Sequence, residues 1–163
     1  MNNKIGIGIA GLGTVGEGFL KQLKKYKTSN KKNSNFELIN IAVKNLKKKR
    51  NVTIKNLPLI KDTLSLASNP KIDIVIELIG GSSGVAYKLV KKSLMNGKSI
   101  ITANKALLAI HGNELIKIAE KNNCFISFEA AIAGGIPVVK AIRENLKFNE
   151  ITKVYGILNG TCN

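Results

Sequence analysis

The chain has 163 residues, with 26 lysines and arginines against 10 aspartates and glutamates, so its formal net charge is +16. It contains no apolar run of the roughly 18 residues that a membrane-spanning helix needs and no leader pattern after Met1, so we expect no membrane partner and a cytoplasmic location. Its two cysteines, Cys124 and Cys162, have neither metal-ligand spacing nor the pattern of a disulfide framework, and we expect both to be reduced.

The basic excess suggests nucleic-acid binding, but its distribution argues against it. Nearly all of the excess is lysine, Arg50 and Arg143 being the only arginines. Much of it falls in two polar runs, 21–32 and 44–55, which contain few aromatic residues. We therefore expect no nucleic-acid partner, and a basic nucleic-acid binder is the third of three functional hypotheses.

The first predicted element is a buried strand, residues 5–10, that leads into a glycine-rich turn at 11–16. In a G-x-G-x-x-G turn the first glycine permits a tight bend, the second lets the backbone approach a pyrophosphate, and the third lets the following helix pack closely. The helix expected at about 15–26 would direct its free N–H groups at the phosphates. A glycine turn without a ligand is the alternative. The predicted cofactor contacts are Gly11, Leu12, Gly13, Thr14, Val15 and Gly16.

Strand and helix patterns then alternate along the chain. Strands are expected at 37–43, 73–79, 99–102 and 125–129, and helices at about 63–67, 85–95 and 113–121. This alternation predicts an α/β fold, a Rossmann-type doubly wound parallel sheet whose ligand lies at the carboxyl ends of the strands. We assign residues 1–130 to this domain.

The last part of the chain departs from this pattern. Pro137 begins a predicted helix that ends near Asn145, and residues 151–158 alternate as a strand. Nothing after this strand closes a folded unit. We therefore expect 131–163 to be the beginning of a second, α+β domain.

Four further segments resemble one known family, in the order in which that family carries them. They are 73–81 (DIVIELIGG), 101–107 (ITANKAL), 128–137 (FEAAIAGGIP) and 156–161 (GILNGT). Together with the glycine turn, they make the chain similar to the amino-terminal half of homoserine dehydrogenase. The resemblance implies NAD(P)-dependent interconversion of L-homoserine and L-aspartate 4-semialdehyde, in the route to threonine and methionine.

The resemblance also implies roles for residues at two strand ends. Gly80 and Gly81 would leave room for the ribose or nicotinamide, an ordinary turn being the alternative. Lys105 would contact the cofactor and help to polarise the carbonyl or move a proton, whereas a surface lysine is the alternative. The single histidine, His111, is expected to enter a helix just before Gly112 and to have no chemical role.

A cation site follows from the same resemblance. A carboxylate with convergent backbone carbonyls is an oxygen set suited to a hard cation. The family binds a structural monovalent cation, usually sodium, and we expect Glu129 to close a strand there, a capped loop without metal being the alternative. The implied ligands are Glu129, Ile132, Gly134 and Ile136.

The choice of cofactor depends on the end of the strand expected at 37–43. An NAD-preferring site places an acidic residue at this point, where the chain has Lys44. A cation there suits a 2′-phosphate. We therefore predict NADP(H), with NAD as the alternative and Lys44 as the leading contact.

Two functional hypotheses precede the nucleic-acid one. The first is an NADP(H)-dependent homoserine dehydrogenase, with small-molecule substrates and a homodimeric state when full length. The second is a cofactor-binding fragment without turnover. It arises because the resemblance implies that the substrate clamp and a second lysine, the usual proton donor, lie beyond Asn163.

Overall fold

The computed structural model describes residues 4–29, 35–53, 57–132, 134 and 136–156. Within these residues, six parallel strands form one sheet in the order β3-β2-β1-β4-β5-β6. The strands are β1 (Ile5–Ala10), β2 (Phe36–Ala42), β3 (Leu59–Ile60), β4 (Ile74–Glu77), β5 (Ser99–Thr102) and β6 (Ile126–Ser127). The order reverses at β1, which confirms the predicted α/β, Rossmann-type doubly wound sheet.

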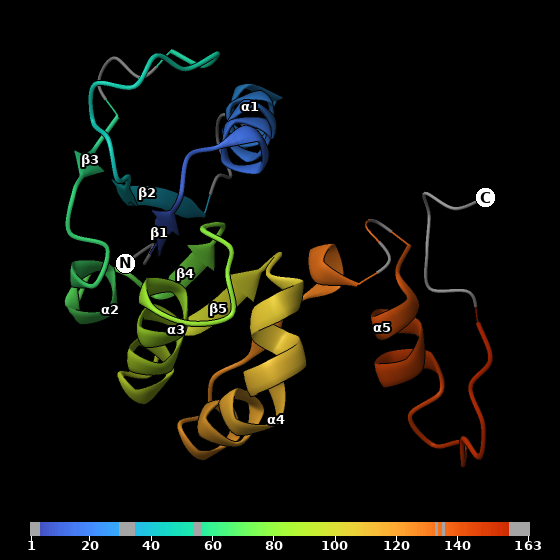
Figure 1. Cartoon of the computed structure of the whole chain (residues 1–163). Helices are drawn as coiled ribbons and strands as arrows, with labels where there is room; N and C mark the ends of the chain where they lie inside the picture. The colour runs from blue at the N-terminus through green and yellow to red at the C-terminus, as the bar shows by residue number, and fades with distance from the viewer. Residues whose placement is uncertain (1–3, 30–34, 54–56, 133, 135, 157–163) are drawn as a thin grey trace.

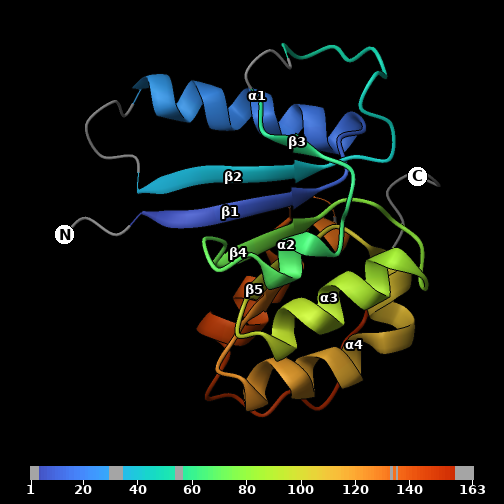
Figure 2. The ribbon, with the colours of Figure 1, turned by 90° about the vertical axis from the view of Figure 1, so that its left-hand side faces the viewer.

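Helices cover both faces of this sheet. The helix α1 (Thr14–Ser29) lies on one face, and α2 (Ser65–Ser68), α3 (Val85–Met95) and α4 (Lys105–Lys121) lie on the other (Figures 1 and 2). The connections move toward opposite edges of the sheet. The connection through α1 leads from β1 to β2 on one side, whereas the connection through α3 leads from β4 to β5 on the other. Right-handed crossovers therefore place them on opposite faces.

The alternation within β1 explains how closely the layers approach each other. Ile7 and Ile9 belong to the apolar cluster on the α1 side, together with Leu20. Gly6 and Gly8, which alternate with these isoleucines, place no side chain on the other face of the strand. A Cβ on Gly8 would lie 2.8 Å from Ile72 Cδ1. A Cβ on Gly6 would overlap the carbonyl oxygen of Lys71. The small residues of β1 thus admit the segment that leads into β4.

Most predicted elements are confirmed, and α3 and β5 begin and end at the predicted residues. The main error concerns α4, which begins at Lys105 rather than near 113. Asn104 caps it, since the Leu107 N–H donates to Asn104 Oδ1 at 3.1 Å. His111 is therefore in the middle of α4 and not at its start, and the buried Gly112 does not interrupt the helix. The two-residue strand β3, directly after Pro58, was not predicted.

The carboxyl-terminal part contains a short helix but no strand within the described residues. The helix predicted after Pro137 is present as α5 (Val138–Lys140) and the π-helical turn η2 (Ala141–Asn145). The strand predicted at 151–158 is wrong over 151–156, which have no regular structure, while 157 and 158 lie outside the described residues. Val154 and Tyr155 are 76% and 84% exposed, so no neighbour supplies the pairing that a strand requires within the part described. The division into domains at 130 stays a prediction.

The last strand, β6, ends at Ser127, so Glu129 does not close a strand as predicted. Glu129 instead begins a 3-10 turn, η1 (Glu129–Ala131). Only two residues of β6 pair with β5, which leaves the following residues to turn away.

Among the helices of the described residues, none combines the length and the apolar character needed to cross a membrane.

Two glycines test the packing around β1. We expect Gly6→Ala to lower the free energy of unfolding by about 2 kcal/mol or more, because the added methyl group overlaps the Lys71 carbonyl. Gly18→Ala is the matched control: Gly18 is exposed within α1, no atom lies within 4 Å of its added Cβ among the described residues, and alanine stabilises a helix relative to glycine by about 0.5–1 kcal/mol. Urea unfolding followed by circular dichroism measures both. Equal changes in the two variants would contradict the close approach at Gly6.

Candidate functional site

A cleft of about 1150 Å³ opens at the carboxyl ends of β1, β2 and β4. It lies where the strand order reverses, the position at which open α/β sheets bind their ligands. Of the predicted cofactor residues, Gly11, Leu12, Gly13 and Lys44 line it. Leu78 and Ile79, which follow β4, form part of the opposite wall.

The three glycines of the turn differ in the space around them. A Cβ on Gly11 would lie 2.6 Å from the Leu78 carbonyl oxygen, and Gly11 has a positive φ of 100°. A Cβ on Gly16 would lie 2.6 Å from the Gly11 carbonyl oxygen. Gly13, in contrast, would meet no atom within 4 Å among the described residues. The first and third glycines thus serve packing, while the second leaves open the space that a pyrophosphate requires.

The remaining residues of the turn begin α1. Thr14 and Val15 are exposed beside the cleft and do not line it. At this end of α1 the Glu17 N–H donates to the Gly13 carbonyl at 2.8 Å. Because the first amides of a helix have no partner within it, this end of α1 suits an anion.

A basic cluster borders the same cleft: Lys44, Lys48, Arg50 and Lys61. The Arg50 guanidinium folds the segment that carries it, by donating to the Asn45 carbonyl at 2.7 Å and the Lys48 carbonyl at 2.9 Å. No carboxylate belongs to the described residues that line the cleft. The cluster can therefore neutralise a phosphate that lies in the cleft.

Gly80 and Gly81 lie further along the same edge and do not line the cleft. Both have a φ of 83°, and a Cβ on either would meet no atom within 4 Å among the described residues. Asn104 holds this loop from the side of β5, because its Nδ2 donates to the Gly81 carbonyl at 2.7 Å. Lys105 follows as the exposed first residue of α4. The structure thus brings the two glycines and the start of α4 together.

Sequence reasoning gave no role to Glu77, which is 0% exposed at the end of β4. Its Oε1 accepts from the Ile79 and Gly80 N–H groups at 2.8 and 3.0 Å, and its Oε2 accepts from the Thr102 hydroxyl at 2.6 Å. Acidic residues are almost never fully buried without partners. A single carboxylate between Ile76 and Leu78 was the signal that would have identified it.

Glu129 lies at the start of η1 and does not line the cleft beside the glycine turn. Its Oε2 is buried and has no hydrogen-bond partner among the described residues. Gly134 has a φ of 62°, and Ile132 and Ile136 are exposed. In the part described, no three histidine, cysteine or acidic side chains lie close enough to hold a metal ion together, so a cation here would depend on carbonyl oxygens. An unpaired buried carboxylate oxygen fits the predicted cation ligand.

His111 belongs to a surface cluster that joins α3 to α4. Its ring stacks on Tyr87 with centroids 4.2 Å apart, and Glu114 Oε2 lies 3.7 Å from its Nδ1. Lys91 donates to Glu114 Oε1 at 2.8 Å. This hydrogen bond, together with the one that the Tyr87 hydroxyl donates to Glu114, lowers the pKa of Glu114. The bond to Glu114, together with the one that Lys91 donates to the Tyr87 hydroxyl oxygen, raises the pKa of Lys91. The cluster links the two helices on the face away from α1.

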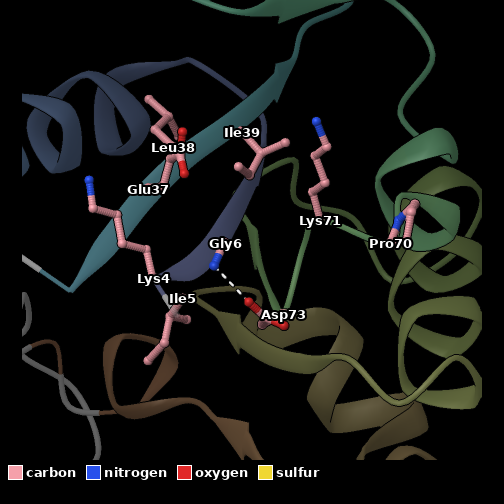
Figure 3. Close-up of a pocket in the computed structure, with 9 residues that line it drawn as sticks. All are labelled: Lys4, Ile5, Gly6, Glu37, Leu38, Ile39, Pro70, Lys71 and Asp73. Carbon is pink, nitrogen blue, oxygen red and sulfur yellow. Dashed lines mark hydrogen bonds between the residues drawn. The ribbon is translucent and has the colours of Figure 1, made fainter. Parts of the chain in front are cut away.

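A second depression, of about 740 Å³, lies at the amino ends of β1 and β2 (Figure 3). Lys4 and Lys71 share it with Glu37 and Asp73, so its charge is mixed. Asp73 Oδ2 is already engaged, since it accepts from the Gly6 N–H at 2.7 Å. With neither a glycine turn nor the start of a helix in its lining, this end is the poorer candidate for a phosphate ligand.

Comparison with known proteins agrees with the geometry. The family described as "Homoserine dehydrogenase, NAD binding domain" matches residues 11–129. Homoserine dehydrogenases of Pseudomonas aeruginosa and Neisseria gonorrhoeae are 44% and 42% identical to the chain, over 96% and 98% of its length but only 36% and 37% of theirs. The crystal structure of a homoserine dehydrogenase from Thiobacillus denitrificans has a TM-score of 0.78 and 41% identity, covering 88% of this chain and 33% of that one. The chain thus spans about a third of the length of the curated relatives it matches.

Gly13 separates ligand binding from folding. We expect Gly13→Ala to leave the melting temperature unchanged, because its Cβ meets no atom within 4 Å among the described residues. The methyl group would occupy the space next to a pyrophosphate and weaken dinucleotide binding by about tenfold, the factor that corresponds to about 1.4 kcal/mol. Fluorescence titration with NADPH and thermal unfolding measure the two effects. Gly11→Ala is the contrasting variant and should lower stability; unchanged affinity in Gly13→Ala would refute the assignment.

Proposed function

The chain belongs to the homoserine dehydrogenase family, and we propose on that premise that it forms the NADP(H)-binding part of an enzyme that interconverts L-homoserine and L-aspartate 4-semialdehyde. The single observation that carries the proposal is the glycine turn, in which an open Gly13 stands between two glycines closed in by backbone. The cleft beside it has room for a nucleotide. We propose a homodimer for the full-length protein.

The choice of NADP(H) is supported by the basic cluster. Lys44 directly follows Val43, the residue after the end of β2, and three other cations share its cleft. A 2′-phosphate needs such cations, whereas a ribose 2′-OH is bound by an acidic residue at this point. Both terminal nitrogens of the Arg50 guanidinium bind carbonyls of its own loop, so we assign the phosphate to the lysines.

The residues of this chain divide the work between the two ends of the cofactor. The glycine turn and the start of α1 would bind the pyrophosphate. Gly80, Gly81 and Lys105 would border the nicotinamide, and Lys105 could polarise the substrate carbonyl or move a proton at its oxygen. NADP(H), when bound, supplies or accepts the hydride.

We further propose that the 163 residues alone bind cofactor without turnover. Hydride transfer requires the substrate carbon to be held against the nicotinamide and the proton on its oxygen to be managed. Of the acid-base groups in the described residues, Lys105 is the one that we place at the nicotinamide end. One lysine cannot both clamp the substrate and transfer its proton.

A further proposal is a structural monovalent cation, sodium being the leading candidate, at Glu129. The unpaired buried Oε2 supports it, and the carbonyls of Ile132, Gly134 and Ile136 are the other proposed ligands. A cation bound there would tie η1 to the segment that leads into α5. Its contribution would be to stability, since Glu129 is not among the residues that line the cleft.

Lys44 provides the test of cofactor choice. We expect Lys44→Ala to weaken NADPH binding by about tenfold and to leave NADH binding unchanged, because only NADPH carries the 2′-phosphate that this lysine would bind. Lys88→Ala is the matched control, since Lys88 is exposed on α3 and does not line the cleft. Isothermal titration of the unsubstituted chain and both variants with each reduced cofactor measures the affinities. Equal affinity of the unsubstituted chain for NADPH and NADH would remove the proposed preference.

The cation proposal is tested through stability. Glu129→Gln should lower the melting temperature by more in sodium chloride than in tetramethylammonium chloride at the same ionic strength, because a ligand that binds only the folded state stabilises it by mass action. Glu120→Gln, on an exposed position of α4, is the control and should show no such difference. Equal shifts of the melting temperature in both salts would leave a turn without metal.

A further inference from the structure

The ends of β4 and β5 are joined by a polar network that the proposed roles leave unexplained. Its members are Glu77, Thr102 and Asn104, which are 0%, 1% and 6% exposed. Burying a charged or polar side chain is costly unless its hydrogen-bonding groups are satisfied. The hydrogen bonds within the network must therefore offset the free-energy cost of removing these side chains from water.

Glu77 is the centre of this network. All three of its partners are donors, the N–H groups of Ile79 and Gly80 and the hydroxyl of Thr102. This set matches a carboxylate, which only accepts. Two of the donors belong to the backbone of the turn that follows β4, so Glu77 determines the path by which the chain leaves the strand.

The network continues through Thr102 to Asn104. The Thr102 hydroxyl oxygen accepts from the Asn104 N–H at 3.0 Å. The Asn104 side chain then acts in two directions, donating from Nδ2 to the Gly81 carbonyl and accepting at Oδ1 from the Leu107 N–H. The same residue thus holds the glycine loop and caps α4, the helix that begins at Lys105.

The result is a loop held at both ends. Glu77 binds the N–H of Gly80 and Asn104 binds the carbonyl of Gly81, while neither glycine has a side chain that could keep it in place. Both have the left-handed φ of 83° that favours glycine. A loop of such freedom keeps one position only if its backbone groups are bound from outside.

We propose that Glu77 is a positioning residue for the nicotinamide half of the cofactor: through Thr102 and Asn104 it fixes the Gly80–Gly81 loop relative to Lys105, without touching the cofactor itself. This inference rests on the proposed function, because it assumes that the nicotinamide lies against this loop. Glu77 does not line the cleft beside the glycine turn. Its loss should therefore affect one half of the dinucleotide and spare the other.

The deciding variant is Glu77→Gln, which preserves shape. The amide oxygen can still accept from Ile79 and Gly80, but the amide nitrogen now meets the Thr102 hydroxyl as a donor, so the hydroxyl hydrogen loses the carboxylate oxygen that accepts it. We expect the affinity for NADPH to fall by about tenfold and the affinity for adenosine 2′,5′-bisphosphate, which lacks the nicotinamide half, to stay unchanged. Isothermal titration with both ligands measures the difference.

Asp73→Asn is the matched control from the other end of the same strand. Asp73 directly precedes β4 and accepts a backbone hydrogen bond from Gly6 at 2.7 Å (Figure 3). Glu77 accepts backbone hydrogen bonds from Ile79 and Gly80 in the same way. Its replacement should lower the melting temperature and leave both affinities unchanged. Such a result would show that loss of a carboxylate next to β4 does not weaken NADPH binding by itself.

A second pair of variants keeps the test decisive if Glu77→Gln does not fold. Thr102→Val removes the hydroxyl that joins Glu77 to Asn104 while keeping the shape, and Thr102→Ser retains it. We expect Thr102→Val to lose NADPH affinity selectively and Thr102→Ser to recover it. Equal losses for the serine and valine variants would overturn the inference.

The remaining outcomes separate the inference from the proposed function. If the unsubstituted chain binds neither NADPH nor adenosine 2′,5′-bisphosphate, the proposed function fails and takes the inference with it. If it binds both and Glu77→Gln binds both equally well, or loses both in parallel, only the inference fails. A selective loss of NADPH affinity supports it.

Discussion

The carboxyl edge of the sheet depends on the close approach between Gly11 and the backbone that follows β4. The Gly11 N–H donates to the Ala42 carbonyl at 2.9 Å, and the Leu78 N–H donates to the Ala10 carbonyl at 2.8 Å, so three strands meet at this point. A side chain at Gly11 would separate them, since its Cβ would lie 2.6 Å from the Leu78 carbonyl oxygen. The cleft exists because the strands converge while Gly13 stays open beside them.

Charge acts on this edge in two different ways. Near the ends of β2 and β3 the lysines of the basic cluster are exposed to solvent, where they can attract an anionic ligand over a distance of about a Debye length. At the ends of β4 and β5 the Glu77 carboxylate is buried and its partners are donors of the chain itself. The exposed cations are available to a ligand, whereas the buried carboxylate organises the backbone around it. The large net charge of the chain therefore says less about the site than the positions of a few residues.

The same division explains the role of the two glycine segments. Gly11 and Gly16 are closed in by neighbouring backbone: the lack of a side chain at Gly11 admits the segment after β4, and at Gly16 it lets α1 pack against the turn. Gly80 and Gly81 have space around them, and external hydrogen bonds keep them in place. Glycine thus serves packing in the first segment and provides an open backbone surface in the second, where it needs the support of Glu77 and Asn104.

Periodicity and turn residues were sufficient to predict the doubly wound sheet, the glycine turn and the bounds of α3 and β5, because these signals are local. The start of α4 and the role of Glu77 were not predicted. Asn104 caps α4 with its own side chain, but the bond that orients it reaches Gly81, 23 residues away, and Glu77 meets Thr102 across 25 residues. The sequence by itself determined most of the segments that form strands and helices, and which turn suits a pyrophosphate. Only the tertiary structure decided which polar groups are buried together, since hydrogen bonds between distant strand ends form once the sheet has brought those ends side by side.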